Sequence, residues 1–260
     1  MTRLFPEPSP RPEEPRTKVV ALVLSGGLGS RMGRPKQFID LLGRPALAYT
    51  LDAFERSPEV DGIFTVGDER RVAELARDGG VSKYAGCALP GESRSRSTKN
   101  GLDLMVGEAP ETIVLVHDGC RCLISESLIG RVAGSLDGAD GVIPAVPVSD
   151  TIKATDGEDP ADEFVAKTID RSTLRAVQTP QAFRLGLLRD IFSAFDEFLD
   201  SATDDASLVE RTGGKVRIVR GEKENIKLTT PEDLVLAEAI LHSRSRLHRI
   251  RDAFKRESWL

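Results

Sequence analysis

Short apolar runs alternate with segments of helical periodicity along the chain. Four runs are apolar almost throughout: VVALVLS (19–25), GIFTVG (62–67), TIVLVHD (112–118) and GVIPAVPV (141–148). Strands of that composition are buried on both faces, as in a parallel sheet covered by helices. Between them, three segments repeat apolar residues every three or four positions, as half-buried helices do: PALAYTLDAFERS, SRSTKNGLDLMVGE and SESLIGRVAGSLDG. The pattern predicts an α/β fold with a mixed, mainly parallel sheet and helices on both faces.

The pattern changes after residue 148. Polar turn residues separate two short strand-like pieces, TIKAT (151–155) and EFVAKTID (163–170). This spacing predicts a β-hairpin arm over about residues 148–176 that projects from the α/β body.

The segments after the arm return to the body. RLGLLRDIFSAFDEFLDS (184–201) has the periodicity of a helix, and KVRIVRG (215–221) that of a further strand. A long closing helix follows, and Thr230 is placed to act as its N-cap.

The two ends of the chain differ from the body, which we expect to be one domain over residues 19–241. Residues 1–18 repeat proline with mixed charge and contain no apolar core of the kind that a secretory signal needs, so they predict a disordered tail. Residues 242–260 mix apolar residues with many arginines. Such a basic helix can lie on a membrane, but we favour a helix that packs on its own body or on a partner subunit.

Composition narrows the possible functions. The formal net charge of -5 gives no global attraction to nucleic acid, so a small phosphorylated ligand at a local cluster of Lys and Arg is favoured. No run is long and apolar enough to cross a bilayer. Cys87, Cys120 and Cys122 make an odd number of cysteines without an export signal, which predicts reduced thiols and a cytoplasmic location.

The loop after the first strand concentrates glycine and positive charge in LVLSGGLGSRMGRPKQF (22–38). Glycines let a backbone turn its N–H groups toward an anion at the start of the next helix. The spacing excludes both a Walker loop, which needs Gly-Lys-Ser/Thr, and a dinucleotide fingerprint, for which GLGSRMG has one residue too many. The remaining pattern, glycines with Arg31 and Lys36, suits a polyphosphate and resembles nucleotidyltransferases that act on sugar phosphates and related phosphates.

A second candidate segment is VLVHDGCRCLIS, in which Asp118 ends a predicted strand. Open α/β sheets bind ligands at the carboxyl ends of their strands, and Mg²⁺ prefers a carboxylate together with phosphate oxygens and water. We therefore expect Asp118 to hold Mg²⁺ and Arg121 to bind substrate, although an aspartate there can also cap a helix. His117, Cys120 and Cys122 match no closed zinc spacing.

Further motifs follow in order: GESRSRSTKNGL, SDTIK, TIDRSTL, QTPQAF, TDDASLVE and GEKENIKLTTPEDLVLAE. Together with the two segments above, they resemble the 2-C-methyl-D-erythritol 4-phosphate cytidylyltransferase family from about residue 19 to 241. The resemblance implies a Rossmann-like fold of the nucleotide-diphospho-sugar transferase type. It also implies transfer of CMP from CTP to methylerythritol phosphate with release of pyrophosphate, Mg²⁺ as cofactor, and a homodimer that exchanges its arms.

The resemblance further implies roles for individual residues. CTP phosphates would lie on the loop of Ser25, Gly26, Gly27 and Gly29, with Arg31 and Lys36 bearing on the triphosphate. Cytosine would be read at Gly91, Glu92 and Ser97. The acceptor would meet Thr203 and, from the arm of the neighbouring subunit, Thr151 and Arg171, while Lys227 would be the second essential lysine.

Two alternatives remain open from the sequence. A ribitol 5-phosphate cytidylyltransferase shares the fold, loop and arm, because acceptor choice depends on few contacts. A non-catalytic nucleotide-binding module is the alternative from another class. It has no need for both Asp118 and Lys227, so their presence favours an enzyme.

Overall fold

A computed structural model describes residues 16–27, 35–156 and 163–257, with the side chains of the last helix described up to residue 246. In this part of the chain, eight strands form one sheet in the order β10-β7-β11-β6-β1-β4-β5, with β12 paired to β7. Neighbouring strands are parallel except where β10 and β11 pair with β7 and β6, so the expected mixed, mainly parallel sheet is confirmed. The strands are β1 (Val19–Leu24), β4 (Gly62–Val66), β5 (Tyr84–Ala88), β6 (Ile113–Asp118), β7 (Gly141–Pro147), β10 (Arg175–Val177), β11 (Gln181–Arg184) and β12 (Val216–Arg220).

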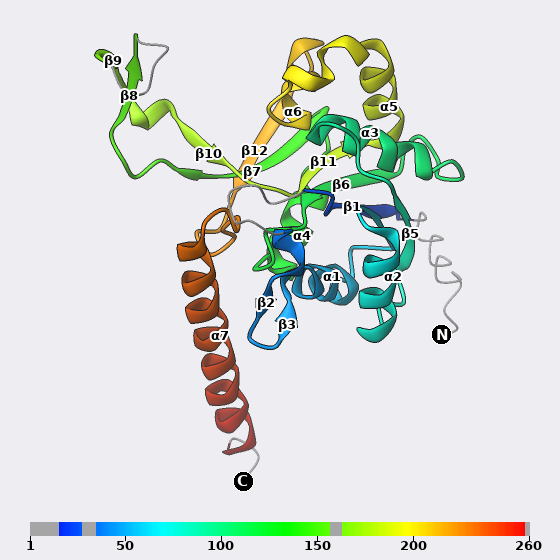
Figure 1. Cartoon of the computed structure of the whole chain (residues 1–260), viewed down its shortest axis with the longest axis vertical. Coiled ribbons are helices and arrows are strands. Elements are labelled where there is room, and N and C mark those ends of the chain that lie inside the picture. Colours follow the sequence, from blue (N-terminus) through cyan, green and yellow to red (C-terminus); the bar gives the residue numbers. More distant parts are fainter. Residues whose placement is uncertain (1–15, 28–34, 157–162, 258–260) are drawn as a thin grey trace, which may run out of the picture.

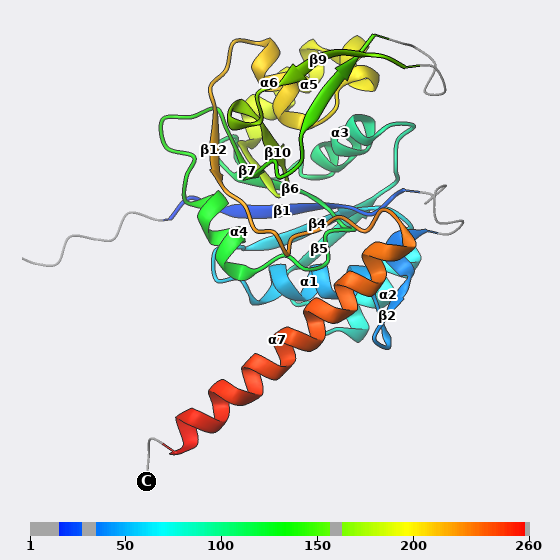
Figure 2. The same cartoon turned by 90° about the vertical axis from the view of Figure 1, so that its left-hand side faces the viewer.

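Helices cover both faces of this sheet, with α1, α2 and α4 on one side and α3, α5 and α6 on the other (Figure 2). These helices are α1 (Ala46–Arg56), α2 (Glu69–Asp78), α3 (Arg94–Leu104), α4 (Glu126–Ala133), α5 (Leu185–Ala194) and α6 (Asp205–Arg211). A small hairpin, β2 (Asp40–Leu41) with β3 (Arg44–Pro45), precedes α1.

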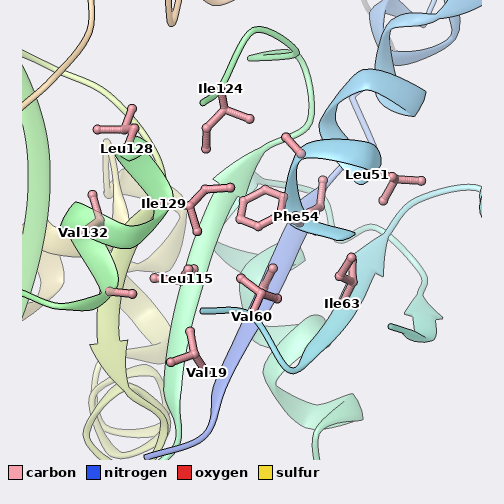
Figure 3. Packing of buried hydrophobic residues seen from close by; sticks show 14 of the residues in the cluster. Val19, Leu51, Phe54, Val60, Ile63, Leu115, Ile124, Leu128, Ile129 and Val132 are labelled. Carbon is pink, nitrogen blue, oxygen red and sulfur yellow. The ribbon is translucent and has the colours of Figure 1, made fainter. Parts of the chain in front are cut away.

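The central strand β1 supplies both hydrophobic cores. Because successive side chains of a strand point to opposite faces, Ala21 and Val23 pack with α1, α2 and α4, whereas Val20 and Leu22 pack with α3, α5 and α6. Figure 3 shows the first core, in which the fully buried ring of Phe54 lies among aliphatic side chains from the sheet and from α4. Burial on both faces explains why the strand segments are apolar without alternation.

Some boundaries differ from the predicted ones. The segment 184–201 is not one helix, because α5 stops at Ala194 and a 3₁₀ helix follows over Asp196–Ser201. The helix α2 and the strand β5 were not predicted. Only Val72 and Ala76 of α2 are fully buried, and β5 (YAGCA) lies half-buried at the sheet edge, so neither carries a strong hydrophobic pattern.

The arm is present as the antiparallel pair β8 (Ile152–Thr155) and β9 (Val165–Ile169), which β10 connects to the body. It projects from the rest of the molecule beyond β10 (Figure 1). Most of its side chains are exposed, and the exposed fraction reaches 69% for Phe164 and 61% for Val165.

The last helix, α7 (Pro231–Glu257), packs its first turns on the body and then extends away from it (Figures 1 and 2). Thr230 was predicted to cap this helix with its side chain, but the capping side chain is that of Asp233. Its carboxylate accepts the backbone N–H groups of Thr229 (2.7 Å) and Thr230 (2.8 Å), and the Thr230 hydroxyl also faces Asp233. Among the described residues, no helix is both long and apolar enough to span a bilayer.

Candidate active site

The largest collection of predicted site residues lines one cavity of about 610 Å³ at the carboxyl ends of the parallel strands. It is formed by the loops after β1 and β5, by the end of β6, and by the segment before α7. Gly29 and Arg31 lie outside the described residues. The predicted residues that line the cavity are Ser25, Gly26, Gly27, Lys36, Gly91, Glu92, Ser97, Asp118 and Lys227.

The loop after β1 is held in place by a side chain that the sequence analysis missed. Gln37 is buried, and its amide nitrogen donates to the carbonyl oxygens of Ser25 (2.6 Å) and Gly27 (3.2 Å). The Ser25 hydroxyl donates to the carbonyl of Val66 (2.9 Å), so it anchors the loop to the neighbouring strand. The carbonyls of Ser25 and Gly27 are thereby occupied, and the N–H of Ser25 donates to the carbonyl of Val66 (2.7 Å), so any N–H groups that bind an anion belong to residues after Ser25.

The loop after β5 is also fixed internally. The hydroxyl of Ser97 accepts from the N–H of Gly91 (3.0 Å) and donates to the carbonyl of Ser93 (2.9 Å). A Cβ on Gly91 would lie 2.6 Å from Arg96 Cβ and 2.7 Å from the Arg96 carbonyl carbon, so only glycine fits there. Ser97, expected to read cytosine, therefore shapes the loop with its hydroxyl, while Glu92 lies exposed at the rim of the cavity.

Three cations surround the carboxylate of Asp118. Lys227 Nζ lies 2.8 Å from Oδ2, Arg94 Nε lies 3.1 Å from Oδ1, and Arg121 Nε lies 3.8 Å from Oδ2. Burial by itself raises the pKa of Asp118, but Arg94 and Lys227 outweigh it and hold that pKa well below its usual range. Asp118 is therefore ionised at neutral pH and is a poor general base. The sequence analysis did not select Arg94, although it lies within GESRSRS.

Hydrogen bonds from the neighbouring segments fix the backbone at Asp118. The hydroxyl of Thr179 accepts the N–H of Asp118 (3.0 Å) and lies 3.1 Å from Nδ1 of His117. On the other side of that ring, Nε2 lies 3.3 Å from the carbonyl oxygen of Arg121. Both ring nitrogens of His117 are thus engaged inside the protein.

A second cavity of about 330 Å³ adjoins the first. Arg94, Asp118 and Lys227 line both cavities, so the ion cluster forms their common wall. Arg121 and Thr203, which were expected to bind the acceptor, line only the second cavity. This arrangement suits two ligands that must meet at Asp118 and Lys227.

Two predicted acceptor residues lie elsewhere, on the arm. Thr151 is exposed beside β8, and Arg171 lies in a separate hollow with Ser149 and Arg175. The guanidinium of Arg171 donates to the carbonyl of Ser149. Neither residue lines the two cavities of its own chain.

Three carboxylates line the two cavities: Glu92 lines the first, Asp204 the second and Asp118 both. The described residues contain no group of three or more His, Cys, Asp and Glu side chains that could hold a metal ion by themselves. A single carboxylate at a cavity that also admits phosphate oxygens fits the way in which Mg²⁺ is usually bound, with substrate phosphates and water completing its shell. Asp118 is the residue that suits this role.

Comparison with known proteins is consistent with this geometry. The family model "IspD: 2-C-methyl-D-erythritol 4-phosphate cytidylyltransferase" matches residues 19–243. A protein of Rubrobacter xylanophilus named 2-C-methyl-D-erythritol 4-phosphate cytidylyltransferase is 64% identical over 228 residues, covering 87% of this chain and 96% of the relative. A protein of the same name from Geobacter metallireducens is 44% identical over 230 residues, covering 86% and 97%. The crystal structure of 4-diphosphocytidyl-2C-methyl-D-erythritol synthase from Anaerococcus prevotii superposes with a TM-score of 0.72 at 32% identity, covering 87% of this chain and 96% of that one.

Proposed function

Because the chain belongs to the 2-C-methyl-D-erythritol 4-phosphate cytidylyltransferase family, it is a cytidylyltransferase that makes CDP-methylerythritol, and we propose that its two adjoining cavities bind the two substrates. CTP occupies the larger cavity, with its phosphates on the loop that begins at Ser25 and near Lys36, and its base toward Gly91 and Glu92. Methylerythritol phosphate occupies the smaller cavity, next to Arg121. The observation that carries this assignment is the shared wall, since transfer requires both substrates to meet at one phosphorus atom.

The reaction follows from that placement. An oxygen of the acceptor's phosphate attacks the α-phosphorus of CTP in line, a new P–O bond forms, and the bond from the α-phosphorus to the bridging oxygen breaks, releasing pyrophosphate. The attacking phosphate is already an anion at neutral pH, so no general base is needed. Catalysis then consists of positioning and charge stabilisation.

The cations of the site supply this stabilisation. Lys36 is almost fully buried at the cavity wall, and Lys227 lies at the common wall of the two cavities. We assign both to the charge that develops on the phosphoryl oxygens, together with Arg31, for which the sequence pattern is the support. Arg121 and Thr203 orient the acceptor.

Magnesium is part of this proposal. Both oxygens of Asp118 are paired, Oδ2 with Lys227 and Oδ1 with Arg94, so Asp118 would hold the ion together with phosphate oxygens of CTP only after Lys227 has turned to the phosphates. The bound ion would neutralise charge on those oxygens. The support is the single ionised carboxylate that faces both cavities.

The first experiment measures pyrophosphate release with Mg²⁺ and CTP, comparing methylerythritol 4-phosphate, ribitol 5-phosphate and no acceptor. We expect a strong preference for the first acceptor. Lys36→Ala and Lys227→Ala should each lower kcat by about two orders of magnitude or more, because each removes a charge interaction that strengthens in the transition state. Lys99→Ala, which breaks an exposed pair with Asp103 on α3, is the matched control and should leave kcat unchanged.

Each other outcome has a definite meaning. Near-normal turnover in both lysine variants would refute the catalytic assignment. Preference for ribitol 5-phosphate would keep the mechanism and change the acceptor, and no release with either acceptor would favour a non-catalytic nucleotide-binding module.

We further propose that two chains exchange arms in a homodimer. The arm buries few of its apolar side chains against its own body, and Arg171 lies outside the cavities that it is expected to serve. In a dimer, Arg171 and Thr151 would reach the acceptor's phosphate in the partner's cavity. A cytoplasmic location stays a prediction, supported by three cysteines that are all free thiols.

Mixing two inactive variants tests the exchange. Lys227→Ala impairs the body of a chain and Arg171→Ala impairs its arm, so a mixed dimer with exchanged arms contains one site with neither substitution. Co-expressed chains should therefore recover activity that neither variant has alone under limiting acceptor. No recovery in isolated mixed dimers would contradict the exchange.

A further inference from the structure

The guanidinium of Arg94 bridges two carboxylates from distant parts of the chain. Its Nε lies 3.1 Å from Asp118 Oδ1 at the end of β6, and its Nη1 lies 2.7 Å from Asp205 Oδ2 at the first residue of α6. The side chain of Asp205 is fully buried, with an exposed fraction of 0%. It lines neither substrate cavity, so it does not touch the substrates directly.

The Asp205 carboxylate has a rigid support. Asp204, the preceding residue, accepts the N–H of Ser207 at the start of α6 (2.9 Å) and the side-chain amide of Gln181 (2.7 Å). The same amide group of Gln181 accepts the N–H of Ala206 (3.2 Å). Asp205 is thereby fixed to strand β11 of the central sheet.

The pairing between Arg94 and Asp205 uses fewer hydrogen bonds than it could. Arg94 Nη2 and Asp205 Oδ1 are both buried, and neither has a hydrogen-bond partner among the described residues. Arginine and carboxylate usually pair through two parallel bonds, and leaving buried polar atoms unpaired is unfavourable. Here the second Arg94–Asp205 bond is absent, and Nε of Arg94 contacts Asp118 instead. This indicates that the arrangement positions Arg94 against Asp118 and does not only stabilise the fold.

We propose that Asp205 is a positioning residue for nucleotidyl transfer: it holds Arg94 so that Arg94 contacts only Oδ1 of Asp118 and leaves Oδ2 to Lys227. This inference rests on the proposed function of the two cavities. Without the charge of Asp205, the guanidinium is drawn to both oxygens of Asp118, because a two-oxygen pair with one carboxylate becomes its best remaining arrangement. Lys227 then loses its partner at the common wall and is no longer held where transfer occurs.

Asp205→Asn tests the proposal, since it keeps the shape of the side chain and removes its charge. We expect kcat for pyrophosphate release to fall about tenfold or more, with KM for CTP and for methylerythritol phosphate within about threefold of the unsubstituted enzyme. Asp205→Glu retains the charge and should recover at least about a third of kcat. Asp200→Asn is the matched control. It removes a carboxylate that pairs near the surface with Arg96, which lies on α3 as Arg94 does, and its kcat should stay within about twofold.

A double variant separates positioning from a general loss of structure. If Asp205 acts through the lysine, adding Asp205→Asn to Lys227→Ala should lower kcat by less than about threefold, whereas independent effects multiply. A full tenfold loss in that background would overturn the proposal. So would a folded Asp205→Asn enzyme with unchanged kcat, or one in which only KM changes.

Two further results keep the test decisive. Circular dichroism and thermal unfolding show whether Asp205→Asn folds, and if it does not, Arg94→Lys is tested in its place. The lysine ammonium cannot contact both carboxylates as the guanidinium does, so this variant should show the same loss in kcat. Normal kcat in a folded Arg94→Lys enzyme would then overturn the proposal. Failure of the proposed function itself is distinct, since the unsubstituted enzyme would release no pyrophosphate with either acceptor.

Discussion

The protonation of His117 gives a prediction whose magnitude follows from the structure. The ring is fully buried and meets the ring of Phe54 edge-on, with centroids 5.2 Å apart. The Thr179 hydroxyl accepts the N–H of Asp118, so its own hydrogen is free to point at Nδ1, and Nε2–H donates to the carbonyl of Arg121. This network requires a neutral ring, and burial lowers the pKa of His117 to about 3.

The sign of the pH effect follows from these values. In the unfolded chain, His117 has a pKa of about 6.5, so between about pH 6.5 and pH 3 the unfolded state binds a proton that the folded state does not. The neutral form contributes its full stability above about pH 6.5, and this contribution is lost as pH falls. Each pH unit below that point lowers the free energy of unfolding by about 1.4 kcal/mol, which gives a loss of about 2 kcal/mol at pH 5.

Urea unfolding of His117→Asn and of the unsubstituted protein between pH 7.5 and pH 5 measures this effect. Asparagine keeps an acceptor for Thr179 and cannot be protonated, so the difference in unfolding free energy between the two proteins should shrink by about 2 kcal/mol over that range. His242→Asn is the control for the substitution itself, because it replaces an exposed histidine and removes no buried ring. Parallel curves for the His117 variant and the unsubstituted protein would refute the reasoning.

Three further substitutions give distinct expectations. Gly91→Ala places a Cβ against the backbone of Arg96 and should raise KM for CTP about tenfold or more in steady-state assays, unless the loop after β5 does not bind CTP. Gly101→Ala brings a Cβ within 2.4 Å of Leu22 Cδ1 and should lower the free energy of unfolding in urea by about 1 to 3 kcal/mol, with kcat unchanged. Burial raises the pKa of Cys120 to about 11, so iodoacetamide at pH 8 should leave activity intact, and rapid inactivation that Cys120→Ala abolishes would contradict this.

The sequence predicts those parts of the fold whose signal lies in a short stretch of neighbouring residues. The apolar runs around β1 and β6 are buried on both faces, and the carboxyl ends of parallel strands meet at one edge, so the placement of Asp118 could be inferred. The arm was also predictable, because turn residues separate its two strand-like pieces. In both cases the signal lies within a short stretch of chain.

The parts that were missed depend on contacts between distant segments. Arg94 and Asp205 are 111 residues apart, and nothing in TDDAS distinguishes the helix-capping Asp204 from the buried Asp205 beside it. The contacts of the Ser97 hydroxyl with Gly91 and Ser93 could be found only from the loop geometry, and the assignment of Ser97 to the base of CTP stays a prediction. Gln37 was missed for the same reason, since its partners are backbone carbonyls.

A site that binds triphosphate contains carboxylates because its cations must be held in place before the ligand arrives. Arg94, Arg121 and Lys227 approach one carboxylate, and with Asp205 behind them three cations face two anions, so one positive charge remains in excess. Without the anions, the cations would repel one another and turn toward water. The side chain of Lys227 is 44% exposed and that of Arg94 only 24%, and Arg94 has a second anchor in Asp205. When phosphate enters, Lys227 is therefore the cation that can exchange its carboxylate partner for the ligand, whereas Arg94 stays fixed and keeps Asp118 in position.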